Sequence, residues 1–160
     1  MKNFKMSSES LPSSLIESRR PIYEQSSDIA NEERVAERLC SWWELDGWKR
    51  NPKMYPIDIS FIKNEEITGF AEIKCRTVSK DTYKTYMISL SKVLSAHEIS
   101  KATGLSCLLI VEWTDRVGWI DLGRVRPEFI GWGGRTDRND AQDMEPVAHY
   151  NIEEFADEHR

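Results

Sequence analysis

Residues 56–76 read PIDISFIKNEEITGFAEIKCR, and the order of apolar and polar side chains in this stretch decides the fold. In its first half, Ile57, Ile59 and Phe61 fall on one face of an extended chain. The second half alternates in the same way from residue 71 to residue 76. A period of two is typical of half-buried strands, and the polar residues between the halves indicate a tight turn. The stretch therefore predicts a β-hairpin.

The predicted hairpin brings two carboxylates and one lysine to a single surface. Pairing that is symmetric about Glu65 places Asp58 opposite Glu72, with Cβ atoms roughly 5 Å apart. Lys74 lies on the same face, one residue pair further along. Two carboxylates this close suit Mg²⁺ or Mn²⁺, and the lysine could hold an attacking water or offset charge on a phosphorus atom. The alternative is a solvated hairpin face with an ordinary cross-strand ion pair.

This pattern resembles the PD-(D/E)XK nuclease superfamily, whose members share the restriction-endonuclease-like fold. Pro56 and Asp58, separated by one residue, resemble the "PD" half of its motif, and the run from Glu72 to Lys74 resembles the "ExK" half. Glu-x-Lys alone is common by chance, but here it follows an aspartate on the partner strand. The resemblance implies that Asp58 and Glu72 bind Mg²⁺, with Mn²⁺ as a substitute, and that the backbone carbonyl of Ile73 is a further ligand. It also implies that Lys74 positions the water and that the products carry a 5′-phosphate and a 3′-hydroxyl.

The chain length and composition fit one globular domain. The 160 residues are 39% hydrophobic and include three cysteines without CxxC spacing. This cysteine usage indicates reduced thiols, and we expect a cytoplasmic protein of a prokaryotic or phage-infected cell, without membrane spans. We expect a flexible N-terminal arm over residues 1–27 and a single domain over residues 28–160. Within that domain, residues 28–122 form the core and residues 123–160 form a C-terminal extension.

The charge of the chain is unevenly distributed. The net charge is −5, which argues against strong non-specific binding to nucleic acid. Residues 74–101 nevertheless carry six basic and two acidic side chains, a local charge of +4. A basic segment that adjoins the hairpin is compatible with phosphate contacts.

The order of predicted elements indicates an α/β fold. We expect helices over residues 28–43 and 89–103, with Asp28 capping the first and Gly104 ending the second. Besides the hairpin, strands are expected over residues 48–54, 106–113 and 117–122. The sequence thus predicts a central mixed sheet of four to five strands flanked by helices, in the order α-β-β-β-α-β-β. Further along, residues 131–135 are expected to form a flexible loop, residues 147–155 an edge strand with a short helix, and residues 157–160 a frayed end.

Glu32 lies in the middle of the apolar stripe of the first helix. A lone carboxylate on a buried stripe is costly unless a partner neutralises it. In many members of the resembled superfamily a first-helix glutamate reaches the metal, and Glu32 resembles the version in archaeal Holliday-junction resolvases. We therefore expect Glu32 to join the catalytic and metal-binding residues, with Glu33 as its substitute. A first-turn glutamate in solvent is the alternative.

Five residues of the basic segment are candidate nucleic-acid contacts: Arg76, Tyr83, Lys84, Tyr86 and Lys92. The two tyrosines could stack on bases or pack at a strand edge. Lys92 lies in the first turn of the second helix, where many relatives place a Lys or Gln close to the site, and an exposed helix lysine is the alternative. In the same helix, Leu90, Val93, Leu94 and His97 are expected to form the buried stripe, with His97 as a core histidine.

The sequence therefore predicts a small metal-dependent nuclease that hydrolyses phosphodiester bonds, in DNA rather than RNA. A non-catalytic nucleic-acid-binding or structural module on the same fold is one alternative, and a junction resolvase or RNA-directed nuclease is another. A homodimer is compatible with the resemblance.

Overall fold

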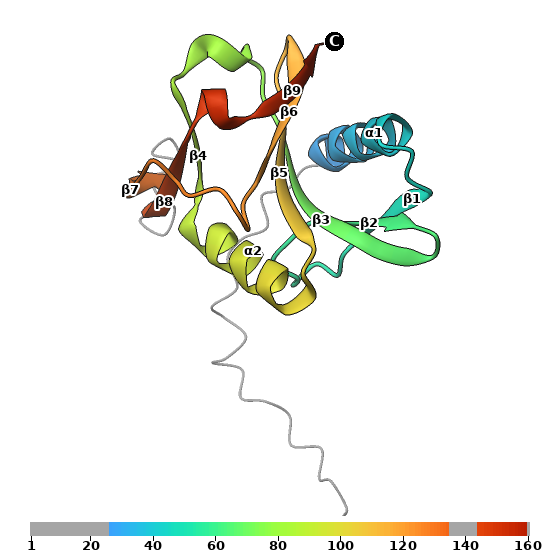
Figure 1. The fold of residues 1–160 in the computed structure, drawn as a ribbon. Helices are drawn as coiled ribbons and strands as arrows, with labels where there is room; N and C mark the ends of the chain where they lie inside the picture. The colour runs from blue at the N-terminus through green and yellow to red at the C-terminus, as the bar shows by residue number, and fades with distance from the viewer. Residues whose placement is uncertain (1–25, 135–143, 160) are drawn as a thin grey trace, which may run out of the picture.

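Two β-sheets and two α-helices make up the fold of the computed structural model, which describes residues 26–134 and 144–159 (Figure 1). In chain order the elements are α1 (Ser26–Trp42), β1 (Gly47–Arg50), β2 (Ile59–Lys63), β3 (Glu66–Cys75), a 3₁₀ turn (Lys80–Thr82), β4 (Thr85–Ser89), α2 (Leu90–Thr103), β5 (Ser106–Glu112), β6 (Arg116–Asp121), β7 (Phe129–Gly134), β8 (Met144–Asn151), a second 3₁₀ turn (Ile152–Glu154) and β9 (Ala156–His159).

The larger sheet is mixed, as the sequence predicts. Its strand order is β1-β2-β3-β5-β6-β9, which gives six strands rather than four to five. Strands β3 and β5 pair in parallel, whereas the other neighbours are antiparallel. Parallel strands need a crossover connection, and here the crossover contains β4 and α2.

Helix α1 covers one face of this sheet. Val35, Ala36 and Leu39 recur at helical spacing, are fully buried and pack against Ala71 and Ile73 of β3. In Figure 1 helix α1 lies on one side of the central strands, and α2, β4, β7 and β8 lie on the other. Burial of this apolar stripe fixes α1 against the sheet and leaves the opposite face of β3 for other partners.

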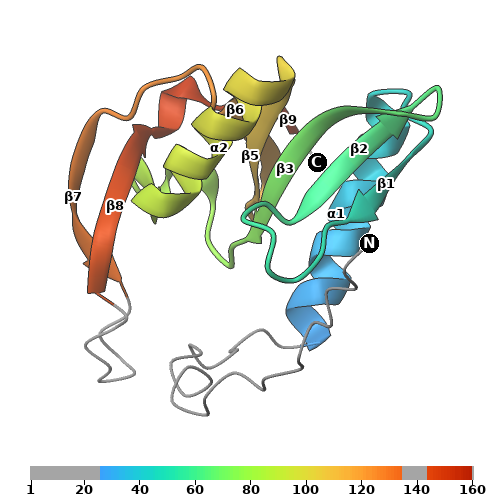
Figure 2. The ribbon, with the colours of Figure 1, turned by 90° about the horizontal axis from the view of Figure 1, so that it is seen from below.

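The opposite face packs against α2 and the three-stranded antiparallel sheet, whose order is β4-β8-β7. Tyr150 of β8 is fully buried in this second core, together with Leu109 of β5. Figure 2, seen from below, shows β7 and β8 on the far side of α2 from β3. Glu72 and Lys74 alternate with the α1-facing residues of β3, so they point toward this side of the sheet.

The hairpin has the predicted register where it matters for the site. Ile59 pairs with Ala71, which extends to Asp58 opposite Glu72. A bulge between Phe61 and Ile62 then shifts the register by one residue toward the turn. The turn residues Asn64 and Glu65 have φ values of 52° and 66°, the left-handed conformation that two-residue hairpin turns require.

Several predicted boundaries near the N-terminus are wrong. Helix α1 begins at Ser26, so Asp28 lies within its first turn and is not the N-cap; residues 1–25 of the predicted arm lie outside the described residues. The first strand ends at Arg50, four residues earlier than expected. Ile57 packs in the core on the α2 side, whereas Ile59 and Phe61 pack on the α1 side. Ile57 precedes the first residue of β2, so its side chain need not follow the alternation of faces along that strand.

The buried stripe of α2 is rotated from its predicted position. Val93 and Ala96 are buried, whereas Leu94 is 57% exposed and His97 is also exposed. His97 is therefore not a core histidine. The predicted end of the helix is confirmed, because Gly104 adopts φ 74° and its N–H bonds to the carbonyl of Ser100. Neither described helix is long and apolar enough to cross a bilayer.

The C-terminal third contains more strand than the sequence suggests. Residues 129–134 form β7 where a loop was expected, and β8 begins at Met144. The expected frayed end instead forms β9, which pairs with β6, while residues 135–143 and 160 lie outside the described residues. Strand β4, absent from the predicted order, pairs with the distant strand β8, from Thr85 with Asn151 to Ser89 with Val147.

Candidate active site

Adjacent strands bring Asp58 and Glu72 to one place on the α2 side of the large sheet. The Glu72 side chain is 1% exposed, and that of Asp58 is 20% exposed. The N–H of Ile73 donates to Oδ2 of Asp58 at 3.4 Å, which holds this carboxylate against β3. The burial of Glu72 excludes the alternative of a solvated hairpin face.

Two lysines bind both carboxylates. Lys74 Nζ lies 2.9 Å from Oε1 of Glu72 and 3.8 Å from Oδ2 of Asp58. Lys92 Nζ lies 2.9 Å from Oε2 of Glu72, 3.9 Å from Oδ1 of Asp58 and 2.7 Å from the carbonyl of Pro56. Lys92 is thus not only an exposed helix lysine, because it reaches from α2 to the carboxylates that β2 and β3 present.

The two lysines affect the two carboxylates differently, because the pKa of Asp58 is raised and that of Glu72 is lowered. Burial and then the nearby charge of Glu72 raise the pKa of Asp58 to about 6, although Lys74 and Lys92 offset part of the effect. Burial would also raise the pKa of Glu72, but the two ammonium groups outweigh it and lower that pKa. Burial lowers the pKa of Lys74, and the charges of Glu72 and Asp58 reverse this and raise it. The two carboxylates are therefore crowded together, and Lys74 and Lys92 offset their negative charge.

Asn51 is a positioning residue that the sequence analysis missed. Its N–H donates to the carbonyl of Asp58 at 2.8 Å, and its side-chain amide donates to the carbonyl of Ile57 at 2.9 Å. Its Oδ1 also accepts from Ser60 at 2.6 Å. Asn51 thus fixes the segment that carries Asp58. A single asparagine between a strand and a proline gives no sequence signal of this role.

The backbone of Ile73 faces the same site. In an antiparallel pair, the N–H and C=O of one residue point toward the same neighbouring strand. The Ile73 N–H points toward Asp58, so its carbonyl lies on the Asp58 side of β3 as well. This direction is compatible with the predicted backbone ligand.

Glu32 is buried on α1, and its main partner is Arg50 of β1. Arg50 Nη1 donates to Oε2 of Glu32 at 3.1 Å, and Arg50 Nε lies 3.9 Å from Oε1 of Glu33. Burial raises the pKa of Glu32, with Lys74 lowering it and Asp58 raising it further. The charges of Lys74 and Asp58 thus act on the pKa of Glu32, while the Glu33 side chain is 45% exposed. The sequence analysis did not identify Arg50 as the partner.

The other candidate nucleic-acid contacts lie beside the site. The Arg76 guanidinium lies 5.2 Å from the ring centre of Tyr86, and both side chains line a 250 Å³ hollow with Glu72, Lys74 and Lys92. Tyr86 is 7% exposed and packs as a β4 core residue, whereas Tyr83 is 66% exposed. Lys84 is exposed as well.

The donor set fits a hard divalent ion that keeps water ligands. No three His, Cys, Asp or Glu side chains of the described residues gather closely enough to enclose a metal. Two carboxylates and a backbone carbonyl nevertheless match the preference of Mg²⁺, which retains several waters and takes further oxygens from a phosphate. Lys74 and Lys92, whose side chains are 35% and 29% exposed, neutralise the carboxylates in the structure.

A known protein family matches most of this chain. A family model described as "Phage putative PDDEXK endonuclease" matches residues 18–158. The chain belongs to this family. Membership confirms the resemblance to PD-(D/E)XK nucleases on which the sequence analysis rests.

Other comparisons add less. A search of curated protein sequences found no match. Among solved structures, the Archaeoglobus fulgidus Hjc, a Holliday junction resolvase from an archaeal hyperthermophile, is similar at 13% sequence identity and a TM-score of 0.45. That likeness covers 74% of this chain and 83% of the resolvase.

Proposed function

We propose that this endonuclease-family member hydrolyses phosphodiester bonds of DNA in a Mg²⁺-dependent reaction, with Mn²⁺ as a substitute metal. The observation that carries the proposal is the pair of carboxylates on adjacent strands that share two ammonium groups within 2.9–3.9 Å. In such an arrangement the carboxylates can bind a metal ion, and the ammonium groups lie close enough to contact a phosphate that the metal binds. We place the activity in the cytoplasm, where the nucleic acid of a phage or its host is accessible.

Asp58, Glu72 and the carbonyl of Ile73 would hold the metal. When bound, Mg²⁺ supplies Lewis-acid polarisation of a phosphate oxygen and lowers the pKa of a bound water. Asn51 keeps Asp58 in position through the backbone on both sides of it. Glu72 gains rigidity from its burial, so the ligands need little reorganisation.

Lys74 is the residue assigned to the water and the developing charge. Its ammonium group lies 2.9 Å from Glu72 and remains 35% exposed, so it can turn toward a substrate from the same strand. A lysine ammonium is a compact donor that can orient water or offset charge on the pentacoordinate phosphorus of the transition state. Lys92 approaches the same carboxylate from α2 and is assigned to a substrate phosphate.

The decisive experiment is a cleavage panel in Mg²⁺, in Mn²⁺ and in EDTA. The panel contains duplex DNA, single-stranded DNA, a flap, a four-way junction and RNA, so that it also separates the junction-resolvase and RNA-directed alternatives. We expect DNA cleavage that requires the metal and that Asp58→Asn and Glu72→Gln abolish. Full activity in EDTA, or in either variant, would contradict the proposal. Absence of cleavage on every substrate, with binding retained, would favour a non-catalytic module.

The role of Glu32 needs a separate test, because its carboxylate accepts a hydrogen bond from Arg50. If Glu32 contributes to the metal site, Glu32→Gln should weaken metal affinity or turnover by about 10-fold, as loss of a supporting ligand does. Glu37→Gln on the same helix is the matched control, because Glu37 is exposed. Equal behaviour of the two variants would reduce Glu32 to a partner of Arg50, and Glu33→Gln would then test the substitute.

A further inference from the structure

A larger pocket adjoins the candidate active site, and no step of the proposed hydrolysis uses it. Its volume is about 420 Å³, and it is lined by residues 76–87 in part, together with Trp113, His149 and Ile152. We call it the β4 pocket. Arg76, Tyr86 and Met87 line both this pocket and the smaller hollow beside Glu72 and Lys74.

Two residues that line the β4 pocket, Tyr86 and Trp113, belong to a preformed aromatic cluster, whose third member, Phe155, packs against them outside the lining. Tyr86 and Trp113 meet edge to face with ring centres 6.2 Å apart, and Phe155 lies 5.5 Å from Trp113 and 5.9 Å from Tyr86. All three side chains are less than 10% exposed. Rings held in this way lose little freedom when a planar ligand binds over them.

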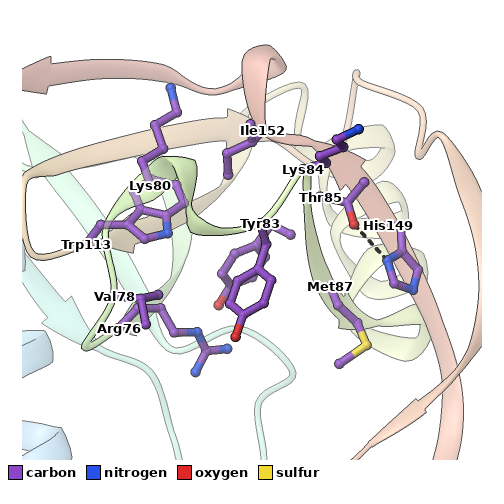
Figure 3. A pocket seen from close by; sticks show the side chains of 11 residues that line it. Arg76, Val78, Lys80, Tyr83, Lys84, Thr85, Met87, Trp113, His149 and Ile152 are labelled. Carbon is purple, nitrogen blue, oxygen red and sulfur yellow. Dashed lines mark hydrogen bonds between the residues drawn. The ribbon is translucent and has the colours of Figure 1, made fainter.

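An exposed aromatic ring, that of Tyr83, lies at the mouth of the pocket beside basic side chains. Tyr83 is 66% exposed and lies between Arg76 on one side and Met87 on the other (Figure 3). His149 forms part of the far wall, where its Nδ1 is 3.1 Å from Oγ1 of Thr85. The hydroxyl of Tyr86 is buried, so Tyr86 presents its ring to a ligand and not its hydroxyl.

The charge of the side chains that line the β4 pocket favours an anionic ligand. Three lining residues are Arg or Lys, and none is Asp or Glu, although the whole chain has a net charge of −5. Lys80 is engaged by Asp157 and the carbonyl of Phe155, which leaves Arg76 and Lys84 near the opening. Aromatic walls with cations at the rim favour a flat, aromatic group joined to an anion. A nucleobase on its sugar-phosphate chain has this chemistry.

We propose that the β4 pocket holds one unstacked nucleobase of the substrate strand, next to the phosphate that Glu72 and Lys74 face. Arg76 comes directly after Cys75, the last residue of β3, and lies two residues beyond Lys74, a distance of about 7 Å along an extended chain. A strand whose phosphate lies at the carboxylates can therefore deliver a neighbouring base to Tyr83. The inference rests on the proposed function for its substrate and adds that the enzyme reads or requires an extruded or unpaired base.

The test measures base-dependent binding without cleavage. Oligonucleotides that carry one abasic position, moved stepwise along the strand, are titrated against the full-length protein in Ca²⁺. We expect one position at which loss of the base weakens binding about 5-fold or more, which corresponds to loss of one stacked base. Tyr83→Ala should remove this dependence and Tyr83→Phe should retain it. Trp132→Ala is the matched control, because Trp132 is 73% exposed and lies outside the pocket.

The outcomes separate the two proposals. Equal binding of every abasic oligonucleotide, or an unchanged profile in Tyr83→Ala, would overturn the base pocket even in an active nuclease. Base-dependent binding by a protein that never cleaves would support the pocket and overturn the proposed hydrolysis. Comparison of single-stranded with duplex oligonucleotides then shows whether the base must be extruded or is already unpaired.

Discussion

Two lysine–carboxylate clusters in this protein are built in opposite ways. In the candidate active site, Glu72 is 1% exposed, whereas its lysine partners are 35% and 29% exposed. In the second cluster, Lys80 is 8% exposed and its partner Asp157 is 21% exposed. The first cluster buries the anion and leaves the cations near solvent, so another cation can replace them. The second buries the cation, so it is suited to hold structure.

The second cluster explains why the C-terminal end is ordered. Lys80 Nζ binds Asp157 and donates to the carbonyl of Phe155 at 3.1 Å, and the Lys80 N–H donates to Asp115 at 2.9 Å. These bonds fasten β9 to the segment after β3. A change in this cluster should therefore affect stability, and a change in the first should affect chemistry.

The largest expected effect is on turnover, in Lys74→Met. Loss of a preorganised electrostatic group lowers kcat on the order of 10²-fold or more. Single-turnover rates in Mg²⁺ measure it, while substrate affinity in Ca²⁺ should change far less. Lys63→Met on the neighbouring strand is the control. Normal cleavage by Lys74→Met would show that its assigned role is wrong.

The second expected effect is on stability, in Lys80→Met. Removal of one partner of a buried ion pair costs about 3–5 kcal/mol. We expect about 2–3 kcal/mol here, below that range, because Arg116 remains 3.5 Å from Asp157. Urea unfolding measures the loss, and the exposed Lys101→Met is the control. A wild-type midpoint in Lys80→Met would show that the two clusters do not differ as described.

The same cluster should give acid sensitivity. The Lys80 hydrogen bond holds the pKa of Asp157 below its usual value. This carboxylate therefore stabilises the fold above its unfolded pKa of about 3.9, and the contribution disappears as the pH falls through the lower folded value. Urea midpoints below about pH 4 should fall more steeply in wild type than in Lys80→Met. Parallel pH profiles would contradict this assignment.

These contrasts indicate which parts of the molecule a sequence can predict. The hairpin follows from local alternation. Its register around Asp58 and Glu72 needs the bulge as well, because the two-residue turn alone would pair Asp58 with Ala71 and the bulge between Phe61 and Ile62 shifts that pairing to Glu72. The position of strand β4 does not follow from local pattern, because its partner β8 is far away in the sequence and only tertiary packing decides the pairing. The contact of Lys92 with Glu72 depends on how α2 docks, and the stripe of that helix was itself predicted with the wrong rotation.

A fourth prediction concerns the crowded carboxylates without metal. Burial and the charge of Glu72 raise the pKa of Asp58 to about 6, so its charged form is unfavourable in the folded protein. Asp58→Asn removes this charge and should raise the melting temperature in EDTA by a few degrees. Mg²⁺ should stabilise the wild type in proportion to its binding, and the variant little or not at all. Equal stabilisation of both proteins by Mg²⁺ would exclude Asp58 as a ligand.

The smallest expected effect distinguishes two roles for Lys92. Its Nζ lies 2.9 Å from Glu72, yet 29% of the side chain is exposed and could meet a phosphate. If it binds a phosphate, Lys92→Met should weaken DNA binding and reduce the salt dependence by about one unit of slope. If it only neutralises Glu72, the slope should stay the same, and the metal-free variant should be less stable because Glu72 keeps one ammonium partner. Binding isotherms across a salt series in Ca²⁺ decide between these outcomes, with Lys101→Met on the same helix as the control. An unchanged slope would assign substrate binding to Arg76 and Lys84 at the rim of the β4 pocket instead.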